Sequence, residues 1–238
     1  MMPDSLFKVQ QEVISCARCA RLVQYRQEVA QTKRRAYRDW EYWGKPVPGF
    51  GDPKARLLVI GLAPAAHGGN RTGRVFTGDS SGDLLYRTLY QTGFASQPHS
   101  VSRDDGMRLK DVYITATVRC APPDNKPQPE EFRNCREYLE RELALLRNVR
   151  VVVALGKIAF DAYLSILQRQ GKIASRSPYH FAHGAVYRFD SPLPTLIASY
   201  HPSRQNTQTG KLTTAMFLAV FRKARKCLQV RREYLKRS

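Results

Sequence analysis

Four short hydrophobic runs recur along the chain, and segments with helical spacing separate them. The runs occupy residues 56–62, 112–115, 149–155 and 195–199. Uninterrupted apolar runs of this length are typical of strands that are buried on both faces of a parallel sheet. We therefore predict a central, mainly parallel four-stranded sheet.

The segments between these runs carry apolar residues at spacings of three and four, which indicates amphipathic helices. Helices are predicted at residues 80–92, 129–147, 157–169 and 212–230. In the second of these, one face carries Phe132, Cys135, Leu139, Leu143 and Leu146, so Cys135 is expected to point inward. Strands alternating with helices predict an α/β protein, a three-layer α/β/α sandwich.

The amino-terminal region combines a helical pattern with a basic, aromatic stretch. Residues 6–23 are predicted to form a helix that contains Cys16 and Cys19, and residues 25–45 are rich in Arg, Lys, Tyr and Trp. A length of 238 residues favours one large domain. We predict a single domain, residues 1–238, that ends in a frayed basic tail at 231–238.

The charge of the chain favours a polyanionic partner. It has 39 Lys and Arg against 20 Asp and Glu, a net charge of +19, and such an excess is typical of nucleic-acid-binding proteins. A basic surface that is merely solvated is the alternative. The start of the chain resembles no signal peptide and no long apolar run occurs, so we expect a cytoplasmic protein, a monomer, with no membrane contact.

Five cysteines suggest a metal site. In a reducing compartment the close pair Cys16 and Cys19 is more typical of metal ligation than of disulfides. With Cys120 and Cys135 it makes a set of four thiols, the usual number for an iron-sulfur cluster or a structural zinc ion, although the spacing differs from that of a zinc ribbon. Cys227 is then left over.

Ligands of open parallel sheets bind at the carboxyl ends of the strands. The first hydrophobic run leads into the glycine-rich segment 61–82, which has neither a Walker nor a Rossmann phosphate motif. Asp79 in this segment stands directly before a predicted helix, where an N-cap and a functional carboxylate are both possible roles. The fourth run leads into residues 200–206, which include His201.

Several of these segments together resemble one family. Residues 61–82, residues 118–123, the sequence His201-Pro202-Ser203 and the cysteine spacing are similar to uracil-DNA glycosylases of the iron-sulfur type, above all to family 5, the type B enzymes of bacteria and archaea. The resemblance implies the glycosylase fold and hydrolysis of the N-glycosidic bond of a deaminated base flipped out of DNA. It also implies that segment 6–45 helps to bind a 4Fe-4S cluster, whose ligands would be Cys16, Cys19, Cys120 and Cys135.

The resemblance assigns roles to individual residues. Phe76 would stack on the flipped base, and His201 would stabilise negative charge on the departing base. Asp79 would orient water or stabilise the positive charge that develops on the sugar. Further contacts to the base would come from Gly61, Leu62, Ala63 and Ala116, and contacts to DNA from His67, Ser203, Arg204, Gln205 and Asn206.

Two positions in this assignment differ from the patterns of related enzymes. Ala63 stands near the place where many other uracil-DNA glycosylases carry a catalytic Asp or Asn, a difference that is typical of family 5. Ala116 replaces an Asn that is common in the family, which weakens discrimination among bases, and Thr115 or Thr117 is a candidate to compensate.

Three hypotheses follow. The first is a repair glycosylase that removes uracil, and also hypoxanthine or xanthine, from double-stranded or single-stranded DNA. The second is a catalytically weak iron-sulfur protein that binds damaged or single-stranded DNA through aromatic stacking and a basic groove. The third is a zinc-stabilised RNA-binding protein.

Overall fold

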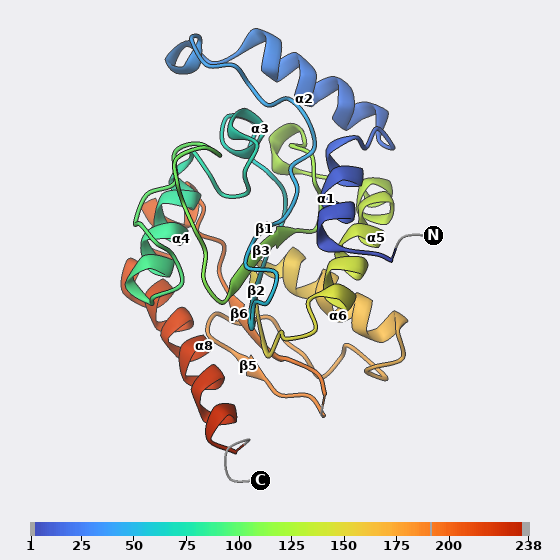
Figure 1. Ribbon diagram of the computed structural model, residues 1–238, viewed down its shortest axis with the longest axis vertical. Coiled ribbons are helices and arrows are strands. Elements are labelled where there is room, and N and C mark those ends of the chain that lie inside the picture. Colours follow the sequence, from blue (N-terminus) through green and yellow to red (C-terminus); the bar gives the residue numbers. More distant parts are fainter. Residues whose placement is uncertain (1–2, 191, 235–238) are drawn as a thin grey trace.

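The computed structural model describes residues 3–190 and 192–234, with the backbone alone for residues 230–234. Its centre is a six-stranded sheet in the order β1-β3-β2-β4-β6-β5 (Figure 1). The four inner strands are parallel to one another. They are β2 (Leu57–Gly61), β3 (Val112–Ala116), β4 (Val151–Leu155) and β6 (Thr195–Ser199). The prediction of an α/β protein with a mainly parallel central sheet is confirmed.

The predicted number of four strands was wrong, because each edge carries one more strand. β1 (Phe50–Gly51) pairs with β3, β5 (Val186–Tyr187) pairs with β6, and both pairings are antiparallel. Each edge strand is only two residues long and partly buried. Two residues are too few for a hydrophobic pattern, so the pairing of these segments depends on the neighbouring strand.

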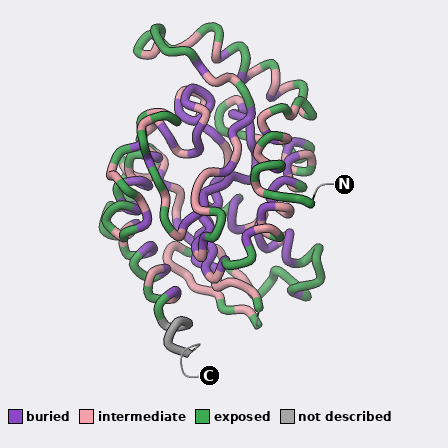
Figure 2. Tube along the Cα trace, in the orientation of Figure 1, coloured by how far each residue is buried: buried purple, intermediate pink, exposed green. Residues whose placement is uncertain are grey.

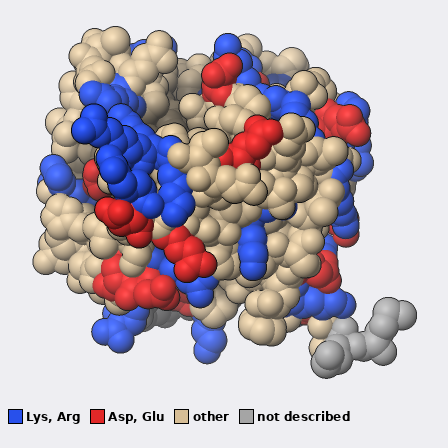
Figure 3. Space-filling view, turned by 90° about the horizontal axis from the view of Figure 1, so that it is seen from above, with Lys and Arg blue, Asp and Glu red and all other residues tan. Residues whose placement is uncertain are grey.

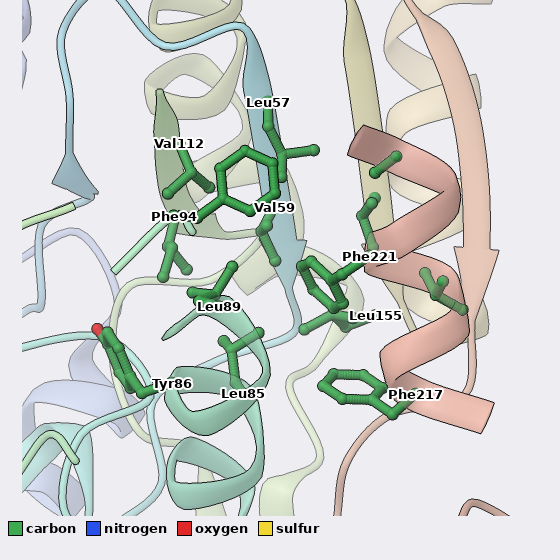
Figure 4. Packing of buried hydrophobic residues seen from close by; sticks show 14 of the residues in the cluster. Leu57, Val59, Leu85, Tyr86, Leu89, Phe94, Val112, Leu155, Phe217 and Phe221 are labelled. Carbon is green, nitrogen blue, oxygen red and sulfur yellow. The ribbon is translucent and has the colours of Figure 1, made fainter. Parts of the chain in front are cut away.

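Helices cover both faces of the sheet. Alternate residues of β2, Leu57 and Val59, face α4 (Ser80–Gln91) and α8 (Thr214–Tyr234) in one hydrophobic cluster (Figure 4). The residues between them, Leu58 and Ile60, belong to a second cluster with α5 (Pro129–Leu145) and α6 (Lys157–Arg169). Figure 2 shows the buried centre and the largely exposed outer surfaces of the helices. Burial of both faces explains why these strands lack a polar alternation.

Four predicted helices are present, with small shifts of their ends. α6 has the predicted bounds, α4 and α5 begin where predicted, and α8 begins two residues later than predicted. α8 also continues to Tyr234, so the first part of the predicted tail is helical, and residues 235–238 lie outside the described residues. No helix in the described part of the chain is both long and apolar enough to span a membrane.

The predicted helix at 6–23 was wrong: two helices form instead, α1 (Leu6–Ile14) and α2 (Ala20–Thr32). The apolar spacing continues across the break, but the two helices pack on different partners. Val9 and Val13 of α1 contact Tyr138 of α5, whereas Leu22 of α2 packs with Val118, Cys120 and Cys135. Cys16 and Cys19 therefore lie in the connection between the helices, and Cys19 is the extended residue that precedes α2.

A buried ion pair joins the sheet to α5. Arg119, just beyond β3, and Glu142 of α5 each expose 1% of their side chains, and Arg119 Nη2 lies 2.6 Å from Glu142 Oε2. The Thr115 hydroxyl donates to the same oxygen at 2.6 Å. The Tyr113 hydroxyl donates to Glu142 Oε1 at 3.5 Å and accepts from Gln10 of α1 at 3.3 Å. The network thus connects β3, α5 and α1 inside the protein.

This network predicts a large effect of Glu142→Ala. The substitution leaves the Arg119 guanidinium buried without its counter-charge, which costs about 3–5 kcal/mol of folding free energy. Urea unfolding measures the loss. Glu137→Ala on the same helix is the control: Glu137 pairs with Arg18, but its side chain is 52% exposed. Its loss should be at most about 1 kcal/mol, and equal urea midpoints for the two variants would contradict the prediction.

Candidate functional site

The glycine-rich segment that follows β2 leads to Asp79, the N-cap residue of α4. Asp79 Oδ1 accepts hydrogen bonds from the backbone N–H groups of Ser81 at 2.9 Å and Gly82 at 3.0 Å. The other oxygen, Oδ2, faces Gly68, where an added Cβ would lie only 2.1 Å from it. Burial raises the pKa of Asp79, and the two backbone hydrogen bonds oppose the rise. The predicted N-cap is confirmed, and one carboxylate oxygen remains outside the cap.

Phe76, in the segment between β2 and α4, lies against His201, which follows β6. Their ring centroids lie 5.8 Å apart at an interplanar angle of 31°. Phe76 has a left-handed backbone with φ of 51°, which is uncommon for an aromatic residue and typical of functional sites. Its ring lies over Gly61, where an added Cβ would be 2.6 Å from the ring. A larger residue at position 61 would displace the aromatic ring.

Burial lowers the pKa of His201 to about 4. The imidazole is therefore neutral at pH 7 and carries one N–H donor and one acceptor. Asn206 of α7 (Arg204–Gln208) donates from Nδ2 to the His201 carbonyl at 2.9 Å, so it helps to fix the backbone of this residue.

A cleft of about 630 Å³ lies beside Asp79. Residues from four separate segments line it, among them Tyr25, Arg34, Tyr37, His67, Gly68, Asp79, Asp124, Asn125 and Arg204. Arg34 and Arg204 bring positive charge to its walls, where an anionic polymer would bind favourably. The face seen from above, over α2 and α3 (Gly69–Thr72), carries a group of Lys and Arg side chains on one side (Figure 3). Phe76 and His201 are not among the residues that line it.

Several lining residues were missed as individual sites. Tyr25, Arg34 and Tyr37 were recognised only as part of a basic, aromatic stretch, and nothing in that pattern distinguishes the residues that reach the cleft. Asp124 and Asn125 were not predicted at all. Both have a positive φ, 52° and 56°, in a turn after β3, and Asn and Asp are the residues other than glycine that adopt this conformation most readily. A Pro-Pro-Asp-Asn sequence was therefore an available signal for a turn.

The residues predicted to contact DNA occupy different environments. Ser203 directly precedes the short helix α7, and its side chain caps this helix by accepting from the Asn206 N–H at 3.3 Å. Arg204 and Gln205 are exposed, which suits contact with a partner. His67 Nδ1 lies 3.0 Å from the Tyr42 hydroxyl, so its ring is oriented by the segment after α2.

Ala116 ends β3 beside Gly61 of β2, the register partner opposite it. Its neighbours do not replace the missing amide. The Thr115 hydroxyl donates to Glu142, and the Thr117 hydroxyl donates to the Leu62 carbonyl at 2.7 Å. Both threonines are buried. Each therefore supports local structure and has no hydroxyl hydrogen to offer a base.

The four cysteines of the predicted set come from the connection between α1 and α2, from the segment after β3 and from α5. Cys120 and Cys135 are buried in one cluster with Leu22 and Val118, and Cys19 packs against it. Burial, with a smaller effect of neighbouring thiols, raises the pKa of Cys120 to about 12 and that of Cys135 to about 11. Asn134 donates to Cys19 Sγ at 3.4 Å, the type of contact that supports a metal ligand.

The thiols do not form a site for a single ion. Among residues 3–190 and 192–234, no three His, Cys, Asp or Glu side chains are close enough to hold one metal. A tetrahedral zinc site would need four sulfur atoms at about 2.3 Å from one ion. In a four-iron cluster each cysteine binds a different iron, so such a cluster does not require four sulfur atoms around one ion.

Comparisons with known proteins agree with this geometry. The family model described as "Uracil DNA glycosylase superfamily" matches residues 48–225, most of the chain. The chain belongs to the uracil-DNA glycosylase superfamily. A "Type-5 uracil-DNA glycosylase" of Thermus thermophilus is 54% identical, over 91% of this chain and 95% of the relative. A protein of the same name from Pyrobaculum aerophilum is 48% identical, over 89% of this chain and 88% of the relative. Another, from Mycobacterium leprae, is 47% identical, over 93% of this chain and 95% of the relative.

The predicted resemblance to this superfamily, and to its fifth family in particular, is confirmed. Membership supports the prediction of an enzyme that hydrolyses N-glycosyl bonds in DNA repair. The family model starts at residue 48 and so leaves α1 and α2 outside its match, but the relative from Thermus thermophilus aligns over 219 residues. An alignment of that length in a chain of 238 residues extends toward the amino terminus beyond residue 48.

The contact between Gly68 and Asp79 predicts the effect of Gly68→Ala. A methyl group at this position displaces Asp79 Oδ2, and a misplacement of about 1 Å at a reacting group lowers a rate by on the order of 100-fold. We expect this loss in uracil excision. Gly171→Ala is the control: nothing lies within 4 Å of its Cβ position and its φ is +67°. This variant should lose stability by about 1 kcal/mol with an unchanged rate, and the reverse pattern would contradict the prediction.

Proposed function

We propose that this protein removes uracil from DNA by flipping the nucleotide and hydrolysing its N-glycosidic bond, and that it also accepts hypoxanthine and xanthine. The observations that carry the proposal are the contact between the Phe76 and His201 rings and the position of Asp79 in the wall of a cleft that also contains Arg34 and Arg204. Family membership supports the uracil activity. The broader base range rests on Ala116, since a site with fewer polar contacts to the base discriminates less.

His201 would act on the departing base. Charge moves onto the base as the bond breaks, and a fixed N–H donor in a partly buried site stabilises that charge. A neutral imidazole suits this role because it donates one hydrogen bond without the cost of burying a full charge. Phe76 would supply an aromatic surface for the flipped base, whose extraction costs a few kcal/mol and is cheapest for a mispaired base.

Asp79 would act on the sugar side of the bond. Its Oδ1 is engaged by two backbone N–H groups, so the free Oδ2 would orient a water molecule or stabilise the developing positive charge. The carboxylate must be ionised for either role. Because burial raises its pKa, the rate should be lost on the acid side at a pH above the ordinary aspartate range.

The test is single-turnover cleavage of labelled duplexes that contain uracil, hypoxanthine, xanthine or no lesion, followed by alkali at the abasic sites. We expect strand breaks with all three lesions, and an acid limb in the pH-rate profile for uracil. Asp79→Asn should lower the rate by about 100-fold or more and remove the limb. Asp190→Asn, the same change at an exposed carboxylate that does not line the cleft, is the control and should keep the wild-type rate.

Two outcomes would count against parts of the proposal. No strand break on any lesion would leave the non-catalytic binder as the better hypothesis, in which the basic cleft and the aromatic rings bind damaged DNA without reaction. Full activity of Asp79→Asn would refute the role of Asp79 while leaving the family assignment intact. If no strand breaks occur, fluorescence anisotropy with each duplex shows whether the protein still binds damaged DNA.

We further propose that Cys16, Cys19, Cys120 and Cys135 hold a 4Fe-4S cluster. The donor set fits: four thiols come together from segments far apart in sequence, and an amide already donates to one of them. Thiols with raised pKa values release their protons only when a metal stabilises the thiolates. A bound cluster supplies a rigid cross-link, which would tie α1 and α2 to β3 and α5 and thereby hold the basic segment after α2 beside the cleft.

The cluster proposal predicts a brown protein with about four iron atoms and four sulfides per chain. Cys135→Ala should lose both the colour and most of the iron, because it removes one of the four ligands. Cys227→Ala is the matched control: this cysteine lies on α8, packed against the other face of the sheet, and the variant should keep its iron. Stoichiometric zinc in a colourless protein would refute the cluster.

A further inference from the structure

Arg71 of α3 is a buried cation inside the glycine-rich segment. Only 4% of the residue is exposed. Its Nε donates to the His67 carbonyl at 2.8 Å, and its Nη2 donates to the Gly78 carbonyl at 2.9 Å. The third nitrogen, Nη1, is buried and has no hydrogen-bond partner among the described residues. A charged group in such a place is costly unless its contacts serve a purpose.

The two carbonyls that Arg71 binds belong to residues next to Asp79 or next to its neighbour. His67 directly precedes Gly68, the residue that Asp79 Oδ2 faces, and Gly78 directly precedes Asp79 itself. The guanidinium therefore links the segment that faces the carboxylate to the segment that carries it. Gly78 has a φ of +81°, and a Cβ there would lie 2.4 Å from Arg71 Nη2. Only glycine permits this approach of the guanidinium.

Two aromatic rings from another segment enclose the same guanidinium. The Arg71 Cζ atom lies 3.9 Å from the centroid of the Tyr37 ring and 4.2 Å from that of Trp40. Both rings belong to the segment after α2, which also carries Arg34 and other cations. The backbone strengthens this link, because Trp43 N–H donates to the Arg71 carbonyl at 2.9 Å. A cation between two ring faces is attracted to both.

We propose that Arg71 is a positioning residue for Asp79: its guanidinium fixes the two carbonyls beside the carboxylate, and Tyr37 and Trp40 hold the guanidinium in place. The cationic segment that would face DNA is thereby joined to the segment that carries the reacting carboxylate. This proposal rests on the role proposed for Asp79. A lysine cannot replace Arg71, because one ammonium lacks the planar fork that reaches two carbonyls while stacking on rings.

Electrostatics supports the geometry. Arg71 is a cation close enough to lower the pKa of Asp79, in opposition to the rise that burial causes. Loss of the cation should therefore raise the pKa of the carboxylate. Since protonation of Asp79 would stop the reaction, the acid limb of the rate should then move to higher pH. A purely structural arginine would not shift this limb.

The experiment measures single-turnover uracil excision across pH, together with duplex affinity. For Arg71→Met, whose chain still fills the space between the rings, we expect a rate lower by about 10- to 100-fold and an acid limb at higher pH. Duplex affinity should change by less than about 3-fold, since the lost contacts act on the reacting group. Arg71→Lys should also lower the rate, but it keeps a positive charge and should leave the limb close to that of the wild type.

Arg103→Lys is the matched control. Arg103 also stacks on an aromatic ring, at 4.8 Å from the centroid of Trp43, but its side chain is half exposed and it donates to neither carbonyl. This variant should keep the wild-type rate and limb. Trp40→Leu is a second test variant, in case the Arg71 variants fail to fold. Trp40 is partly exposed, so its replacement should disturb folding less than a change at buried Arg71. We expect it to lower the rate as well, by a smaller factor.

The results separate this proposal from the one on which it rests. If Arg71→Met slows the reaction without moving the acid limb, or if its effect multiplies fully with that of Asp79→Asn, Arg71 does not act through Asp79. Wild-type rates in both Arg71→Lys and Trp40→Leu would also overturn the proposal. Full activity of Asp79→Asn instead refutes the catalytic role of Asp79, whatever the Arg71 variants do.

Discussion

Burial of both faces of the sheet is the constraint on which the rest of the structure depends. Helices α4 and α8 cover one face and α5 and α6 the other, so neither face of the inner strands remains free to bind a ligand. Binding is left to the segments that leave the carboxyl ends of the parallel strands. β2 ends there at Gly61 and β3 at Ala116, which lie opposite each other in the register of the two strands. His201 follows β6 at the same end of the sheet. The fold thereby assembles the site from segments far apart in sequence.

Much of this framework could be predicted from the sequence because local signals agree with the final packing. α6 has the predicted bounds, and residues 195–199 form the predicted strand. The predictions failed where contacts between residues far apart in sequence determine the local structure. β1 and β5 exist because a neighbouring strand pairs with them, and the break between α1 and α2 exists because the two helices pack on different partners. The single-domain interpretation stays a prediction.

The residues of the site likewise fall into those with a local signal in the sequence and those whose contacts form only in the folded chain. Asp79 could be found because an N-cap is encoded by neighbouring residues, and His201 because it directly follows a strand. The resemblance to the family supplied their proposed chemistry. Arg71 was not predicted as a site residue, because its partners Tyr37 and Trp40 approach it only in the folded chain. The question of Thr115 and Thr117 was likewise settled by which groups their hydroxyls reach, Glu142 and the Leu62 carbonyl.

The docking of α1 on α5 has a consequence for the order of events during synthesis. α1 is translated before its partners Tyr138 and Arg141, which belong to α5. Until α5 has been translated, α1 lacks its docking surface, and the loop that must close is long. The contact of Cys16 with the same hydrophobic cluster is also absent during this interval. The connection between α1 and α2 therefore takes its final position only after α5 has formed.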